Sequence, residues 1–369
     1  MKAGGIIGGL VVGLVAGLGV GVYVIGGGGS EPAMQGAEPA ADAVPAAKAV
    51  RWKMASAFGS QWPIQGDLGM RFVDKVDAVS GGTLKIQFFE PGALVPALEI
   101  FDAVSSGSID AGWTTAGYWA GKVPALQFFT AVPFGPDGME YAAWLYYGGG
   151  DELYNEIYQP YNIKAMHCGM HSPEGSGWFR KPIETLDDLK GLKMRFFGLG
   201  ARVMEKVGVS TQLLAGGDIF PALELGTIDA TEYSMPVIDL NQGFWQIAKH
   251  YYFPGWHQPS SIFELMINRA RWDALSPQQQ EIIEIVCGDN YRAGLGMSEA
   301  AQAKALTELR AKGVEFHRWP DETLDVFRNA WAEVAEEEAA KDPMFRKVLD
   351  SFNSFRAEYK VWADLGYAR

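Results

Sequence analysis

The chain has few histidines, few cysteines and a deficit of positive charge. Its five His residues form no His-Glu-x-x-His or similar pair, which argues against a histidine-built catalytic metal site. Only 31 Lys and Arg stand against 44 Asp and Glu, so the net charge is −13, and no long basic run is present. These features disfavour nucleic acid as a partner. An acidic protein repels anions at long range, so an anionic ligand would need a local Arg, a metal ion or a helix N-terminus.

The two cysteines, Cys168 and Cys287, indicate no function. Their spacing matches no zinc or redox motif. They could form one disulfide in an oxidising compartment or remain two buried thiols. We slightly favour the thiols, because Cys behaves as a small hydrophobe.

One long apolar run is present, at the N-terminus. Residues 4–25, "GGIIGGLVVGLVAGLGVGVYVI", are uncharged and long enough for a helix to span a bilayer. We predict a membrane anchor or signal segment over residues 1–28 and a flexible Gly/Ala/Pro-rich linker over residues 29–49. The apolar core is longer than in a typical signal peptide, so an uncleaved anchor is favoured over a cleaved signal. In both cases the remainder is exported, either tethered to the inner membrane or free in the periplasm.

Two α/β units follow the linker. Strand patterns at residues 49–58, 81–92 and 108–115 alternate with helical segments at 68–79 and 96–107, and a similar order restarts after residue 160. This β-α-β order predicts mostly parallel sheets covered by helices. Beyond residue 260 we expect one more strand, a long helix capped by Ser276 with Pro277 at its first position, and two further helices with solvated acidic faces.

The same corner occurs twice along the chain. "VSSGSIDAGWTTAGYW" (104–119) and "LELGTIDATEYSMP" (223–236) each pass from a helix through Gly to Ile-Asp-Ala and an aromatic cluster. In open α/β sheets ligands bind beyond the carboxyl ends of the strands. We therefore expect two lobes that present their strand ends to one shared cleft.

The polar and aromatic residues at predicted strand ends are the candidate site. They are Phe58, Tyr118, Trp119, Glu174, Arg195, Glu232, Tyr233 and Gln258. Arg195 lies in an apolar strand and so requires an anionic partner, either a structural carboxylate or a ligand. Each of the others has a plainer alternative: Tyr118 and Trp119 as core aromatics, Glu232 as a loop acid. The neighbouring His257 also deserves a test, although a loop histidine is the simpler interpretation.

Three long motifs carry a family resemblance. "GWFRKPIETLDDLKGLKMR" (177–195), "GGDIFPALELGTIDATEY" (216–233) and "YYFPGWHQPSS" (251–261) closely resemble the substrate-binding subunits of TRAP transporters, the DctP-like family. The chain is most similar to the group that binds 2-oxo acids and small hydroxy acids, over residues 50–362. The resemblance implies a two-lobed, periplasmic-binding-protein-like α/β fold with crossing hinge segments and long helices. We assign residues 50–172 and 261–300 to lobe I, and residues 173–260 and 301–369 to lobe II.

The resemblance also implies roles for individual residues. Arg195 would receive the substrate carboxylate, and a Na⁺ or Ca²⁺ ion would be held by Glu174, Glu232, the backbone carbonyl of Tyr233, and Gln258. Glu174 and Gln258 exchange the amide and acid of the family pattern, which keeps the number and charge of the oxygen ligands suited to a hard cation. Tyr233 stands at the position where the family pattern has Trp. Phe58, Tyr118 and Tyr233 would wall the side-chain pocket.

The predicted function is therefore an extracytoplasmic solute receptor for a small 2-oxo or 2-hydroxy monocarboxylate, which it delivers to TRAP permease subunits. The alternatives are a sensory receptor for a membrane signalling protein and a metal-dependent lyase or isomerase with Glu232 as base; we predict that the chain is not an enzyme. Relatives dimerise through a further C-terminal helix, so here we expect a monomer or an anchor-mediated dimer. We also expect Arg195→Ala to abolish binding and leave the fold intact.

Overall fold

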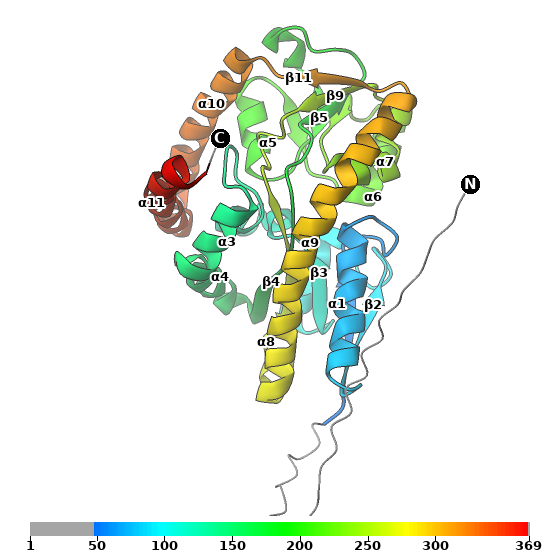
Figure 1. The fold of residues 1–369 in the computed structure, drawn as a ribbon, viewed down its shortest axis with the longest axis vertical. Coiled ribbons are helices and arrows are strands. Elements are labelled where there is room, and N and C mark those ends of the chain that lie inside the picture. Colours follow the sequence, from blue (N-terminus) through cyan, green and yellow to red (C-terminus); the bar gives the residue numbers. More distant parts are fainter. Residues whose placement is uncertain (1–47, 368–369) are drawn as a thin grey trace, which may run out of the picture. The chain divides into compact units, whose positions relative to one another are not determined.

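The computed structural model describes residues 48–367 (Figure 1). The predicted membrane segment, residues 1–28, and all but the last two residues of the predicted linker, 29–49, lie outside this range. Within residues 48–367, no helix has the length and apolarity needed to cross a membrane.

The first sheet has five strands in the order β2-β1-β3-β10-β4. These are β1 (Val50–Ser56), β2 (Leu84–Phe89), β3 (Ala111–Thr114), β4 (Ile163–His171) and β10 (Ser261–Asn268). Strand β1 runs parallel to β2 and β3, as the β-α-β order predicts. Strand β10 returns from the other half of the chain and pairs antiparallel with both β3 and β4.

The second sheet has six strands in the order β11-β9-β5-β8-β6-β7. These are β5 (Gly177–Phe179), β6 (Lys193–Arg195), β7 (Ser210–Gln212), β8 (Ala230–Thr231), β9 (His250–Phe253) and β11 (Glu315–Arg318). Strand β6 is parallel to β7 and β8, and β9 is parallel to β11, whereas β5 runs antiparallel to β8 and β9. The predicted two-sheet α/β architecture is confirmed, with more antiparallel pairing than expected.

Eleven α-helices surround the two sheets in the described range. They are α1 (Gln65–Val79), α2 (Ile100–Ser106), α3 (Gly138–Tyr147), α4 (Gly150–Tyr158), α5 (Leu199–Lys206), α6 (Gly216–Glu224), α7 (Pro236–Gln242), α8 (Arg269–Asp273), α9 (Pro277–Ala311), α10 (Asp321–Lys341) and α11 (Pro343–Gly366). Short 3₁₀ turns η1 (Ala97–Glu99), η2 (Ala116–Trp119), η3 (Pro124–Phe129), η4 (Gln159–Tyr161), η5 (Leu186–Leu189) and η6 (Phe244–Gln246) complete the set.

Helix α9 connects the two halves of the molecule. It contacts β4 and α1 beside the first sheet and α7 beside the second, and Figure 1 shows it running past both. Its N-terminus is capped as predicted: Ser276 Oγ accepts from the backbone N–H of Gln279 at 3.2 Å, and Gln279 Oε1 accepts from the N–H of Ser276 at 3.1 Å.

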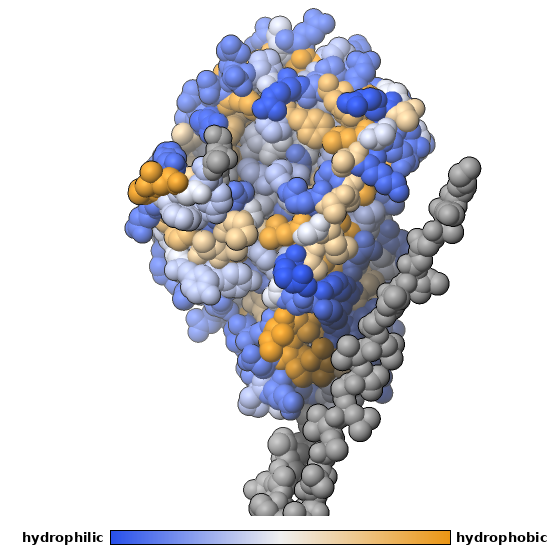
Figure 2. Space-filling model, in the orientation of Figure 1, coloured by the Kyte–Doolittle hydropathy of each residue, from blue (hydrophilic) through white to orange (hydrophobic). Residues whose placement is uncertain are grey.

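Helix α11 contacts elements of both assigned segments. It packs on α10, within residues 301–369, and also on α3, α4 and η3, which belong to the segment assigned to lobe I. The reason is its apolar stripe: Phe345 and Phe352 place their rings 4.7 and 5.6 Å from that of Phe128 in η3. The opposite side is solvated, and the face in Figure 2 is mostly hydrophilic, with apolar side chains in separate groups over parts of α9 and α11.

Cys168 and Cys287 form a disulfide, so the thiol interpretation was wrong. The bond joins β4 to α9 across 119 residues, with the Cα atoms 4.1 Å apart. Both side chains are buried where α9 packs on the sheet. Sequence spacing could not reveal this, because the contact depends on how the helix lies over the strand.

The two Ile-Asp-Ala corners have one backbone design. Gly107 and Gly226 adopt positive φ angles of 78° and 71°, which favour glycine, where the helix chains turn back toward the sheets. The following Asp then binds the neighbouring strand: Asp110 Oδ2 accepts from the N–H of Lys53 at 2.8 Å, and Asp229 Oδ2 accepts from the N–H of Lys193 at 2.9 Å. Each corner thus fixes the register of its strand pair.

Two crossing segments join the sheets. Residues 172–176 lead from β4 to β5, and residues 254–260 lead back from β9 to β10. They meet at a backbone hydrogen bond from Glu174 N–H to Gln258 O of 3.2 Å. Side chains from these segments therefore lie between the two sheets.

Candidate functional site

Arg195 and Glu232 form a buried ion pair at the end of the second sheet. Arg195 ends β6 and Glu232 follows the neighbouring β8, so both project from adjacent strand ends. The guanidinium Nη1 donates to Glu232 Oε1 at 2.6 Å and to its backbone oxygen at 2.9 Å, and Nε donates to Leu214 O at 3.2 Å. The exposed fractions are 1% and 0%. The anionic partner that the sequence required for Arg195 is therefore Glu232, within the protein.

Glu232 has two further neighbours that fix its carboxylate. Its Oε1 also accepts from the backbone N–H of Phe197 at 2.6 Å, and its Oε2 lies 3.3 Å from Nε2 of His257. The Arg195 guanidinium lies 5.3 Å from the centre of the Tyr233 ring, a cation–π distance. The interpretation of Glu232 as an ordinary loop acid was wrong.

Glu174 lies between two histidines. Its Oε1 is 3.2 Å from Nε2 of His171, and its Oε2 is 3.6 Å from Nε2 of His257. Burial alone would raise the pKa of Glu174, but the two imidazoles outweigh it and lower that pKa. Burial alone would likewise lower the pKa of His257, but Glu174 and Glu232 raise it to about 9. His257 does lie in a turn, yet it belongs to this cluster.

Two oxygens in the site are buried without a hydrogen bond. They are Oε2 of Glu174 and Oε1 of Gln258, whose residues are 4% and 3% exposed. Buried polar atoms without partners are costly unless a ligand or ion satisfies them. One ligand atom each from Glu174, Glu232 and His257 can lie within 4.8 Å of one another. With its pKa raised to about 9, His257 is protonated in this state, so the donors for an added cation are the oxygens of Glu174, Glu232 and Gln258. Hard oxygens of this kind fit a cation such as Na⁺ or Ca²⁺.

The first sheet contributes an aromatic wall opposite these charges. Phe58, which follows β1, lies 5.5 Å from Phe263 and 6.3 Å from Tyr118, measured between ring centres. Tyr118 meets Phe197 of the second sheet edge-on at 5.4 Å. Trp119 is not part of this wall, because its Nε1 donates to Glu264 at 2.7 Å in the core of the first lobe.

A small cavity lies between the wall and the charged cluster. Its volume is about 20 Å³, which is room for a single water-sized group. Six predicted residues line it: Phe58, Tyr118, Glu174, Arg195, Tyr233 and Gln258. Glu232 is not among the lining residues and lies behind Arg195.

Sequence reasoning missed several residues at this cavity, notably Gln65 and His171. Gln65 begins α1, and its Oε1 accepts from the hydroxyl of Tyr233 at 2.9 Å. His171 ends β4, so the strand-end rule that selected the other candidates would have found it. Nothing in the sequence around Gln65 indicated a bond to a residue 168 positions away.

The contact between the lobes is close on both sides of the cavity. The Tyr233–Gln65 hydrogen bond joins the second sheet's β8 corner to α1. On the other side a Cβ at Gly117 would lie 2.3 Å from Phe197 Cζ, so only glycine permits the observed approach of Phe197 to η2.

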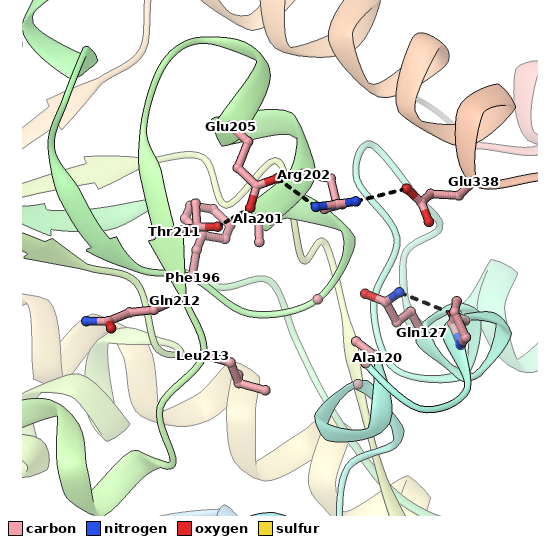
Figure 3. A pocket seen from close by; sticks show the side chains of 14 residues that line it. Ala120, Gln127, Phe196, Ala201, Arg202, Glu205, Thr211, Gln212, Leu213 and Glu338 are labelled. Carbon is pink, nitrogen blue, oxygen red and sulfur yellow. Dashed lines mark hydrogen bonds and ion pairs between the residues drawn. The ribbon is translucent and has the colours of Figure 1, made fainter. Parts of the chain in front are cut away.

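A larger groove of about 380 Å³ lies beyond Gly117, between η2–η3 and the β6–α5–β7 region (Figure 3). Its charged side chains are already paired: Arg202 lies 2.9 Å from Glu205 and 3.3 Å from Glu338. Thr211 donates to Glu205 at 2.6 Å. The groove therefore has fewer polar groups without a hydrogen-bond or ionic partner than the smaller cavity.

Comparison with known proteins gives a consistent assignment. Residues 54–342 match the model of the DctP family, described as bacterial extracellular solute-binding protein family 7. A monocarboxylate 2-oxoacid-binding periplasmic protein of Nostoc sp. is 36% identical over 316 residues, which cover 85% of this chain and 86% of that protein.

Solved structures of TRAP solute-binding proteins have the same fold. The protein of Bordetella bronchiseptica, with calcium and picolinate, gives a TM-score of 0.83 at 34% identity, covering 86% of this chain and 95% of that one. The protein of Colwellia psychrerythraea, with calcium and pyruvate, gives 0.82 at 36% identity, covering 86% and 98%. The protein of Pseudoalteromonas atlantica, with sodium and pyruvate, gives 0.81 at 34%, covering 86% and 97%.

Proposed function

This chain belongs to bacterial extracellular solute-binding protein family 7, the DctP family, and from that premise we propose that it is the receptor of a TRAP transporter for a small 2-oxo or 2-hydroxy monocarboxylate, bound together with Na⁺ or Ca²⁺. The observation that carries the proposal is the pair of buried oxygens of Glu174 and Gln258 that accept no hydrogen bond, beside Arg195 at one cavity. A cation and an anion arriving together satisfy all three groups.

The two halves of the ligand meet different chemistry. The carboxylate would face the Arg195 guanidinium, whose fork suits a carboxylate. The cation would be held by Glu174, Glu232, Gln258 and the backbone carbonyl of Tyr233. It would draw in the 2-oxygen of the acid together with a carboxylate oxygen, and this favours 2-substituted acids over plain ones. Phe58, Tyr118 and Tyr233 would enclose the rest of the ligand.

The charged side chains at the cavity favour a monocarboxylate. Among the described residues that line the cavity, Arg195 is the only Arg or Lys, and it is already shared with Glu232. His171 and His257 both face Glu174. A second carboxylate would therefore be buried without a cation, which is costly. The cavity of about 20 Å³ must expand by separation of the lobes to admit even a three-carbon acid.

The family consists of solute-binding receptors, so the chain is not an enzyme. The geometry agrees for the residue that the lyase alternative required. Oε1 of Glu232 accepts hydrogen bonds from Arg195 and from the N–H of Phe197, so this oxygen is already occupied and does not face the cavity as a general base would. The sensory alternative has no observation in its favour.

Partners and location extend the same proposal. The protein is assigned to the periplasm, as its family members are. There it would deliver the acid to TRAP permease subunits, tethered by residues 1–28. A receptor that closes over its ligand in this way presents one defined surface to the permease only when both lobes are together.

The test is ligand binding with and without the ion. Calorimetry on chelator-treated protein would compare pyruvate, lactate and succinate in buffer with Ca²⁺, with Na⁺, and with neither. We expect pyruvate or lactate to bind only with the ion, and Arg195→Lys to weaken binding at least about a hundredfold because the fork is lost. Ion-independent binding of succinate would contradict both the metal site and the monocarboxylate assignment.

A further inference from the structure

A second group of metal-ligating side chains lies far from the acid site in the fold, on strands β9 and β11. These strands run parallel, with His250 paired to Glu315 and Tyr252 paired to His317. Because alternate residues of a strand face the same side, these four side chains form a square on one face of the sheet. Strand β11 is an edge strand, since β9 is its only neighbour in the sheet order.

The square brings three metal-ligating groups together. His250 Nδ1 lies 3.0 Å from His317 Nε2, and Oε2 of Glu315 lies 3.6 Å from the first nitrogen and 3.9 Å from the second. One ligand atom from each of the three can be within 4.8 Å of the others. Without an ion the two imidazole nitrogens share a hydrogen bond, which a metal ion bound by both would replace.

We propose that His250, Glu315 and His317 bind a divalent transition-metal ion, with Zn²⁺ as the representative. Zinc–nitrogen bonds of 2.0–2.1 Å at a tetrahedral angle place two ligand nitrogens about 3.3 Å apart. The observed 3.0 Å is close to that value, and the Glu315 distances need only a small rotation of an exposed side chain. The fourth position faces solvent.

The surroundings favour an ion at this point. The Tyr252 ring stacks on the His317 ring, with centres 4.7 Å apart and planes at 17°, and this holds the imidazole in place. The side chains of His250, His317 and Glu315 are 14%, 27% and 67% exposed, so an ion can reach them from solvent.

This site differs in kind from the acid site. The acid site offers mainly oxygens, which suit Na⁺ and Ca²⁺, whereas two imidazoles and one carboxylate suit Zn²⁺, Ni²⁺ or Cu²⁺. An ion here would pin the edge strand β11 to β9. Strand β9 ends at Phe253, directly before the crossing segment that carries His257 and Gln258. The ion would therefore stiffen the strand from which that segment departs.

The experiment is a Zn²⁺ titration of the full chain after treatment with a chelator and its removal. A chromophoric competitor reports the affinity, and excess Ca²⁺ with pyruvate is present so that Glu174 and Glu232 are not free for Zn²⁺. The variants His250→Gln, His317→Gln and Glu315→Gln are compared with Glu358→Gln, on the exposed side of α11.

We expect one Zn²⁺ per chain in the wild type. Losing either His250 or His317 should weaken it about tenfold or more, since even partners of metal ligands matter to that degree, and Glu315→Gln should weaken it less. Glu358→Gln should leave it unchanged. Imidazole ¹⁵N shifts should move for His250 and His317 only. Equal Zn²⁺ affinity in the wild type and His317→Gln, or shifts at histidines other than these two, would overturn the proposal.

Discussion

The corner that leads into β3 and the corner that leads into β8 can be compared residue by residue. Met54 pairs with Ala111 in the first sheet, and Met194 pairs with Ala230 in the second. The residue after each Met is Ala55 in the first lobe and Arg195 in the second. The residue two positions after each Ala is Trp113 in the first lobe and Glu232 in the second. The backbone, the glycine and the strand-binding Asp are shared, and these two side chains differ.

The difference separates scaffold from chemistry. Trp113 is buried by packing, with its ring 5.9 Å from that of Phe263 and its N–H donated to Gln65 O at 2.9 Å. Apolar burial of this kind is favourable by itself. The Arg195–Glu232 pair is buried at a large desolvation cost, which only close partners offset. A fold that needed only a second corner could have repeated Trp113, so the charged version indicates a ligand.

The largest expected effect comes from breaking the charged corner. Arg195→Met leaves the buried Glu232 with only His257 and the N–H of Phe197, so the free energy of unfolding should fall by about 3 kcal/mol and acid binding should be lost. This revises the expectation that an Arg195 variant keeps the fold intact. Urea unfolding and calorimetry measure the two effects, with Arg202→Met, an exposed arginine of α5, as the control.

The double variant Arg195→Met/Glu232→Gln separates stability from binding. It removes both charges, so most of the lost stability should return, whereas acid binding should not. Recovery of binding in the double variant would show that the ligand does not need the guanidinium.

The next effect concerns the approach of one lobe to the other. Gly117→Ala places a Cβ against Phe197, so the closed form should be destabilised by about 1–3 kcal/mol and acid affinity should fall accordingly. Gly121→Ala is the matched control in the same loop, because a Cβ there meets nothing within 4 Å. Calorimetry measures the affinity of both variants for the acid. Equal affinities would mean that Phe197 moves aside without an energetic cost.

The corner aspartates should have similar effects on stability and unequal effects on binding. Asp110→Ala and Asp229→Ala each remove one acceptor from a strand N–H, which should cost about 1.5 kcal/mol in denaturant unfolding. Asp110→Ala also removes the ion pair with the exposed Arg271, which should add little. Only Asp229→Ala loosens the strands that carry Arg195 and Glu232, so it alone should weaken acid binding. If both variants weaken it alike, the two corners contribute equally to the site.

The smallest effect should come from the hydrogen bond between Tyr233 and Gln65. Tyr233→Phe removes it and should weaken acid binding by about 0.5–1.5 kcal/mol, the usual net value of one such bond. A double-mutant cycle with Gln65→Met isolates the bond, because the second substitution should add little once the first is made. Strictly additive losses would mean that the two residues act separately.

The sequence predicted the parts of this structure that depend on local pattern. The repeated corner, the Ser276 cap and the need of Arg195 for an anionic partner follow from residue type and order. The disulfide, the contact of α11 with α3 and α4, and the bond from Gln65 to Tyr233 depend on how distant elements pack. The ionic partner itself was left open, because a buried Arg can pair with protein or with ligand.

The near absence of free space in the acid site has a kinetic consequence. Arg195, Glu174 and Gln258 are each less than 5% exposed, and the cavity beside them has a volume of about 20 Å³. An acid therefore cannot enter while the lobes are in this contact. Its entry waits until Phe197 leaves Gly117 and Tyr233 leaves Gln65. Acids of different affinity would then share one upper limit on their association rate, which is set by the opening of the empty receptor.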